Sequence, residues 1–334
     1  MNNAPRFETS FLPAQLSNLN FDYWGTVVKT YEEKKYYDTL LAVLDYINPK
    51  LVEETGNADK SKFVMPHGSI KVYMEITPDG YSIRAPFLRM PEPASVALMR
   101  QIAEINFSKL TLPQIVLKGN ELHFEYESPI DACEPYKVYR IIEEICINAD
   151  SYDDTFIEKF GAQRLEEPQI EKVAEDKMEL AWQKFKEYLE EGLAYVDYFQ
   201  QKRMEGFAWD SLYITLAKID YYMRPQGVLR FELEKAVRGL YGDAPLVEKI
   251  NKTKAVIQKF LAMEKVKFME SIGITKVLIS ERAKMEIAGV QNYLKRTEEG
   301  AKSEISSANY MAGTLNMMVG ITSLFYNYNV PQNI

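Results

Sequence analysis

The sequence predicts an α+β protein in which a helix-and-sheet domain is followed by an all-helical region. Two observations support this prediction. Between residues 62 and 127, apolar residues alternate with polar ones, which is the two-residue period of half-buried strands. From residue 168 onward that period disappears, and apolar residues recur at three- and four-residue steps, as they do on helices. A chain of 334 residues is also long enough for two ordinary domains.

The first domain begins after an irregular, proline-containing lead-in at residues 1–24. A single helix is expected over residues 26–47, and Pro49 ends it because the residue before a proline resists the α region. Three strands joined as a meander follow, at residues 62–65, 69–76 and 81–87. The turn between the last two contains Pro78 and Gly80, which preset one φ angle and permit a positive one.

Two prolines, Pro91 and Pro93, stop this meander. A helix is expected over residues 94–106, followed by a hairpin with strands at residues 114–117 and 121–127. A strongly amphipathic helix over residues 131–149 and a shorter helical segment over residues 153–160 close the domain. We therefore place the first domain at residues 25–165.

The sheet of this domain has one apolar and one polar face. Ile70, Val72 and Met74 lie on one side of the second strand, with polar residues between them. An antiparallel sheet with one covered face leaves its other face solvated or covered by a partner. We take this outer face as a candidate protein-binding surface, with the candidate residues Lys71, Tyr73, Arg84, Val116 and His123.

The element order of the first domain is helix, three strands, helix, two strands, helix. Its most distinctive segments are Arg-Ala-Pro-Phe-Leu-Arg-Met-Pro at residues 84–91 and Leu-Lys-Gly-Asn-Glu-Leu-His-Phe-Glu-Tyr at residues 117–126. In this order and in these segments, residues 25–165 resemble the type III secretion chaperone fold and the bacterial YbjN-like family that shares it. The resemblance implies a small dimeric domain that binds protein segments and has no active site. The long helical second half departs from the compact stand-alone chaperones.

The second domain, residues 166–334, is expected to be a helical bundle or an elongated helical arm. Gly273 makes residues 271–275 the best candidate for a hinge within it. The expected helices are at residues 168–204, 208–223, 228–240 and 244–269, with a final helical stretch that reaches about residue 326.

The last thirty residues, 305–334, carry no charge and follow helical spacing. Their serine, threonine and asparagine residues favour a helix packed against protein over one inserted in a membrane, because each polar group in hydrocarbon needs a partner. Gly313 and Gly320 are easier to explain where another chain segment approaches closely. We therefore expect an assembly element here, with the candidate partner-binding residues Met311, Leu315, Met318 and Phe325.

The residue types that carry chemistry are sparse. His67 and His123 are the two histidines, one in a turn and one on the outer strand face, and both are expected to be solvated. We predict no catalytic, metal or cofactor site. Two cysteines, Cys133 and Cys146, do not make a disulfide framework, and no secretory signal is visible, so a cytoplasmic location is expected. The net charge of −8 argues against nucleic-acid binding.

These observations predict a non-enzymatic chaperone or adaptor that binds partner proteins through its first domain and forms a homodimer. The alternative is a structural subunit of a larger assembly, of the secretion or injection type, anchored through the helical second half. A third alternative is an enzyme of unrecognised type, but the sequence shows no catalytic site that would support it.

Overall fold

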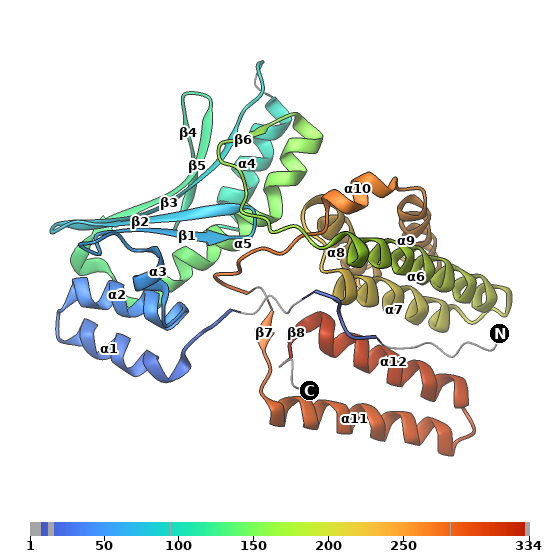
Figure 1. Cartoon of the computed structure of the whole chain (residues 1–334). Coiled ribbons are helices and arrows are strands. Elements are labelled where there is room, and N and C mark those ends of the chain that lie inside the picture. Colours follow the sequence, from blue (N-terminus) through green and yellow to red (C-terminus); the bar gives the residue numbers. More distant parts are fainter. Residues whose placement is uncertain (1–7, 13–16, 94, 281, 331–334) are drawn as a thin grey trace. The chain divides into compact units, whose positions relative to one another are not determined.

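The fold is described from a computed structural model of the chain (Figure 1). The structure describes residues 8–12, 17–93, 95–280 and 282–330, so parts of the expected lead-in, the start of the helix expected at residue 94 and the last residues of the tail lie outside it. The described residues form two compact units. The α+β unit comprises residues 17–171 and 275–280, and the helical unit comprises residues 8–12, 172–274 and 282–330. The expected α+β class is confirmed.

An antiparallel sheet is the centre of the α+β unit. Its main strands lie in the order β1-β2-β3-β5-β4, and a short strand, β6, pairs with the end of β3. The expected meander and hairpin are both present, each strand within two residues of its expected bounds, and β5 joins the hairpin to β3. The strands are β1 (Lys62–His67), β2 (Ile70–Ile76), β3 (Gly80–Arg89), β4 (Gln114–Lys118), β5 (Glu121–Pro129) and β6 (Gln163–Arg164).

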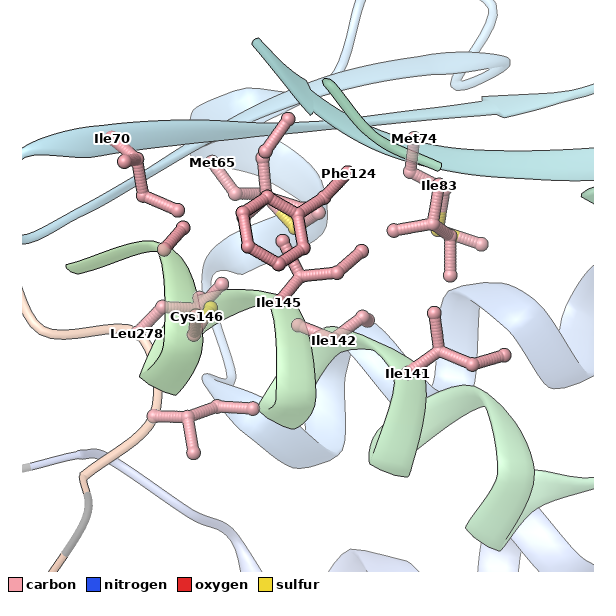
Figure 2. Packing of buried hydrophobic residues seen from close by; sticks show 14 of the residues in the cluster. Met65, Ile70, Met74, Ile83, Phe124, Ile141, Ile142, Ile145, Cys146 and Leu278 are labelled. Carbon is pink, nitrogen blue, oxygen red and sulfur yellow. The ribbon is translucent and has the colours of Figure 1, made fainter. Parts of the chain in front are cut away.

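The core of this unit lies between the sheet and helix α5 (Pro135–Phe160). Figure 2 shows Ile141, Ile142 and Ile145 of α5 pointing toward the apolar face of the sheet. The sequence predicted two separate segments here, which is wrong: α5 is continuous, because its buried stripe carries on to Phe156 beyond the polar residues near 150–154. The Glu134 side chain caps its start, accepting a hydrogen bond from the Lys137 N–H at 2.8 Å.

The single helix expected over residues 26–47 is also wrong. The chain forms α1 (Trp24–Glu32) and α2 (Tyr36–Ile47), followed by the short α3 (Leu51–Thr55). The break falls at Lys34, whose φ of 58° is left-handed. Residues 32–35 are exposed and charged, so no apolar side chain holds them in a helix. Helix α4 (Val96–Ser108) begins at Ser95, whose side chain accepts from the Leu98 N–H at 3.3 Å.

The helical unit contains seven helices among its described residues. The helix expected over residues 168–204 begins only at Glu175. The helix expected over residues 244–269 is divided into two at residues 262–264. The seven are α6 (Glu175–Gln201), α7 (Glu205–Met223), α8 (Gly227–Leu240), α9 (Leu246–Leu261), α10 (Lys265–Glu270), α11 (Ile287–Ser306) and α12 (Tyr310–Asn327).

The last two helices, α11 and α12, form a hairpin that also packs on α7. A Cβ atom added at Gly320 would overlap the Thr297 side chain, and one at Gly313 would lie 2.7 Å from Ile305 Cγ1. The expected close approach at these glycines is therefore confirmed, and the neighbouring segment is α11 of the same chain. Short strands β7 (Ala283–Lys284) and β8 (Tyr328–Asn329) pair in parallel next to this hairpin.

Two short segments belong to a different unit from their neighbours in sequence. Glu8 and Leu12 lie in the helical unit, where Glu8 accepts hydrogen bonds from Lys184 and Tyr188 at 3.0 Å each and Leu12 is buried. Conversely, residues 275–280 lie in the α+β unit, although helices of the other unit precede and follow them. We call residues 275–280 the strap. It contains the expected hinge residue Thr275, but the chain there, which is neither helix nor strand and bends at Leu278 and Ile279, is packed in the α+β unit.

Candidate protein-binding site

The strap places two adjacent apolar side chains in the α+β unit. Leu278 and Ile279 are both buried and belong to the same apolar cluster as Ile70 and Cys146 (Figure 2). Burial of one such side chain stabilises a fold by about 1.5–3 kcal/mol. The strap is therefore part of the core of a domain that is otherwise complete more than a hundred residues earlier in the chain.

Backbone hydrogen bonds fix the strap to the turn between β1 and β2. The Gly68 N–H donates to the Lys276 carbonyl at 2.8 Å. Two residues further on, the Leu278 N–H donates to Nδ1 of His67 at 3.1 Å. The prediction that His67 is solvated is wrong, because its imidazole ring is buried and accepts a hydrogen bond from the strap.

Helix α5 holds the same turn from its other side. Asp150 Oδ1 accepts from the Ser69 N–H at 2.8 Å and from the Ser69 hydroxyl at 3.1 Å. Gly68 lies at a φ of 53°, and a Cβ atom there would overlap the Asp150 carboxylate. A side chain at position 68 would have to displace that carboxylate, so glycine lets the turn keep both its hydrogen bonds to Asp150 and its N–H contact with the strap.

A second carboxylate on α5 fastens β6. Arg164 of β6 pairs with Asp153 at 3.1 Å and also with Asp154. Asp153 is buried, and burial together with the neighbouring Asp154 charge raises the pKa of Asp153 from 3.8 to about 7. Asp153 therefore stays protonated to a higher pH than an ordinary aspartate.

The outer face of the sheet brings together the five residues that the sequence predicted for it. Tyr73, Arg84 and Glu125 are paired directly across β2, β3 and β5. On the next row, His123 lies between Pro86 and Val116. Strand β2 alternates strictly between buried and half-buried residues, which is the two-faced pattern that the sequence predicted.

Glu166, in the segment after β6, lies over part of this face. The Tyr73 hydroxyl donates to Glu166 Oε1 at 2.7 Å, and Lys71 Nζ is 3.2 Å from Oε2. Burial and this hydrogen bond raise the pKa of Tyr73 to about 12. Lys71 and Tyr73 therefore have a partner within the chain. No local pattern in the sequence signals this contact, because Glu166 follows the last strand of the sheet.

The rest of the face is more open. Arg84 is exposed, and Val64, the residue opposite Tyr73 on β1, is 42% exposed. Val116 and His123 are half-buried, with His123 Nε2 3.6 Å from Glu121 Oε2. The accessible part of the face thus combines an aliphatic side chain with a guanidinium group.

The candidate residues of the C-terminal helix have a different environment. Leu315 and Met318 are buried in the apolar cluster of the helical unit, and the Phe325 ring lies 4.6 Å from the Tyr221 ring of α7. Met311 is exposed at the first turn of α12. Most of the stripe expected to bind a partner is thus covered inside the chain, because α12 packs on α7, most of whose residues are buried.

In the part of the chain that the structure describes, no helix is both long and apolar enough to cross a membrane. Across the same residues, no group of three or more His, Cys, Asp or Glu side chains could hold a metal ion. Comparison with protein-family models gives no match to the chain, and a search of curated proteins gives none either. The likeness to secretion chaperones therefore stays a prediction.

Proposed function

We propose that this protein is a non-enzymatic adaptor or chaperone whose α+β unit binds extended segments of other proteins. The observation that carries the proposal is the strap. The unit holds a short non-helical stretch of its own chain through two backbone groups and two neighbouring apolar side chains. Main-chain hydrogen bonds combined with side-chain pockets are the general means by which domains recognise extended peptides.

The outer sheet face is where a partner would be held while the strap stays in place. Arg84 and Val64 offer a charged and an aliphatic contact on one row of the sheet, the mixture found at the edges of protein interfaces. The partner segment would pair a carboxylate with Arg84 and place apolar side chains on Val64 and Val116.

Self-association of the α+β unit through α4 and β4 belongs to the same proposal. Phe107 is 93% exposed and Val96 67% exposed on α4, and Leu117 of β4 is also exposed. Exposed apolar side chains mark an interaction surface where they join into one patch, as the proposed contact requires of these three. Strand-to-strand pairing is disfavoured at this edge. The Asn106 amide already donates to the Ile115 carbonyl at 3.0 Å and accepts from the Ile115 N–H at 2.7 Å.

The alternative, a structural subunit anchored by residues 305–334, has less support. The apolar stripe that would form the anchor packs against α7 of the same chain. A subunit would have to use another surface of the helical unit.

The test is capture of partners by three forms of the tagged full-length protein: the unchanged chain, Arg84→Glu and Lys29→Glu. Lys29 is a control because its side chain is exposed on α1 of the same unit and the charge change is identical. We expect one or a few proteins to bind the unchanged chain and the control but to be lost with Arg84→Glu at an unchanged melting temperature. Capture that survives Arg84→Glu would place the contact elsewhere. A single stoichiometric complex would favour the subunit function.

A further inference from the structure

The helical unit contains a pocket that the proposed function does not use. Its volume is about 300 Å³, and it lies between α6, α7 and the first turns of α12. This volume is at the lower end of the range of small-molecule sites, roughly 300–1,000 Å³. Its lining includes Tyr188, Glu191, Gly192, Thr215, Lys218 and Thr314.

The pocket walls are apolar although several lining residues carry hydroxyl groups. The hydroxyls of Ser211, Thr215 and Thr314 each donate to the carbonyl oxygen four residues earlier, at 2.8, 2.7 and 2.9 Å. Their donor hydrogens are therefore used, and their carbon atoms form the wall. At Gly192, a Cβ atom would overlap the Thr215 side chain, so α6 and α7 approach closely at this point.

One cationic side chain lies in this apolar surrounding. Lys218 is 6% exposed. Its Nζ lies 3.3 Å from Glu191 Oε2 and 3.8 Å from the centre of the Tyr188 ring. An ammonium group has three N–H donors. Among the described residues, Glu191 accepts one hydrogen bond from it and the aromatic face contacts a second side. A buried charge is costly unless its donors are satisfied, so a third acceptor at this point is favoured.

Carboxylates near Lys218 already outnumber the cations. Glu191 pairs with Lys218, while Glu8 and Glu187 each pair with Lys184 at 3.0 Å and Glu8 also accepts from the Tyr188 hydroxyl. A ligand carboxylate would add a fourth anion to two cations, and a ligand ammonium would face Lys218 directly. The acceptor that fits is therefore an uncharged oxygen.

We propose that this pocket binds a small uncharged apolar molecule with one hydroxyl or carbonyl oxygen, which accepts a hydrogen bond from Lys218. At a packing density of about 0.75, the pocket holds about a dozen non-hydrogen atoms. The ligand enters at the first turns of α12, where Tyr310, Met311 and Thr314 are exposed and form the rim. The site is independent of the sheet face in the α+β unit.

The test is calorimetric titration of the full-length protein with nonanol, nonanoate and nonylamine, which share one chain length and differ in the charge of the head group. We expect saturable binding of nonanol, about tenfold or more tighter than binding of either charged compound. Lys218→Met should lower the affinity for nonanol about tenfold, because it removes one hydrogen bond from a charged donor. The control Lys252→Met removes a lysine on α9 that is exposed, and should leave the affinity unchanged.

A second pair of variants tests the location. Thr314→Trp places a large ring at the rim and should abolish nonanol binding, whereas Asn316→Trp, an exposed position on the same helix outside the pocket, should not. If Lys218→Met fails to fold, Lys218→Met combined with Glu191→Gln removes both charges together. Equal binding by Thr314→Trp and the unchanged chain, tighter binding of nonanoate than of nonanol, or no saturable binding of nonanol would each overturn the proposal. None of these outcomes bears on partner capture by the sheet face.

Discussion

The backbone N–H of Leu278 donates to Nδ1 of His67 at 3.1 Å, across 211 positions of sequence. An imidazole nitrogen that accepts a hydrogen bond carries no hydrogen, so His67 is in the tautomer with its hydrogen on Nε2. Through this contact a segment between two helices of the helical unit completes the α+β unit. The strap therefore makes the α+β unit dependent on the second half of the chain.

Replacing His67 tests this contact. His67→Phe keeps a ring of similar size but removes the acceptor, so the Leu278 amide should exchange its hydrogen about tenfold faster, the effect of losing one net hydrogen bond. Hydrogen exchange with mass spectrometry on peptides that cover the strap measures this. His123→Phe, on the outer sheet face, is the matched control. Equal protection of the strap in both variants would show that the His67 contact does not hold it.

Gly68→Ala should be more destabilising than an ordinary substitution at a positive φ. Gly119 has a similar φ of 64° but open space around it, whereas a Cβ at Gly68 overlaps Asp150. We expect Gly119→Ala to lower the free energy of unfolding by about 1 kcal/mol, and Gly68→Ala to lower it by about 2 kcal/mol or more. Urea unfolding of both variants measures the difference. Equal losses would mean that Asp150 can move away without cost.

Asp153 should make stability depend on pH. Its pKa is about 7 in the folded state and near 3.8 in the unfolded state, so the folded state releases this proton at a higher pH than the unfolded state. The stabilising contribution of the protonated group is fully present below pH 3.8 and is lost as the pH rises to about 7. Asp153→Asn cannot ionise, so its stability relative to the unchanged chain should increase between pH 4 and pH 8.

Urea unfolding at several pH values measures this trend. Asp79→Asn, at an exposed turn, is the control and should show no such increase. The Arg164 guanidinium stays charged across this range and Asp154 remains beside it in both proteins, so the slope of the stability difference with pH is the informative quantity. A constant difference between Asp153→Asn and the unchanged chain would show that Asp153 is ionised throughout.

The exposed Phe107 should contribute to self-association. We expect the full-length protein to be dimeric by light scattering at high micromolar concentration, and Phe107→Asp to shift it toward the monomer because a carboxylate cannot be buried at an apolar contact without cost. Val247→Asp, at an exposed position on α9 in the helical unit, is the control. A strictly monomeric full-length protein would contradict dimerisation through α4 and β4.

The sheet was predictable because burial on one face imposes an alternation that the sequence displays, as at Ile70, Val72 and Met74. The amphipathic stripe of α5 was visible for the same reason, although its polar residues near 150 suggested a break. Breaks such as the one at Lys34 were missed because the apolar residues on either side still match one helical period.

Contacts between distant segments were not predictable from a single sequence. His67 has the local sequence of an exposed turn, yet its ring is buried and accepts a hydrogen bond from Leu278, 211 positions away. Tyr73 was identified correctly on the outer face, but its hydrogen bond to Glu166 has no periodic signal. The pocket was missed in the same way, since Lys218 resembles any lysine on a helix until α6 and α12 enclose it.

The central claim is that the α+β unit binds extended peptide segments, and a peptide titration tests it most directly. In a full-length double variant that combines Leu278→Ser with Ile279→Ser, the strap loses its two buried apolar side chains and should leave its site. We predict that a labelled peptide with the natural sequence of residues 272–282 then binds this variant one to one, measured by fluorescence anisotropy. The same peptide carrying both serine substitutions should not bind. If the variant is folded by circular dichroism and the natural peptide shows no saturable binding, the α+β unit does not recognise extended segments and the account is contradicted.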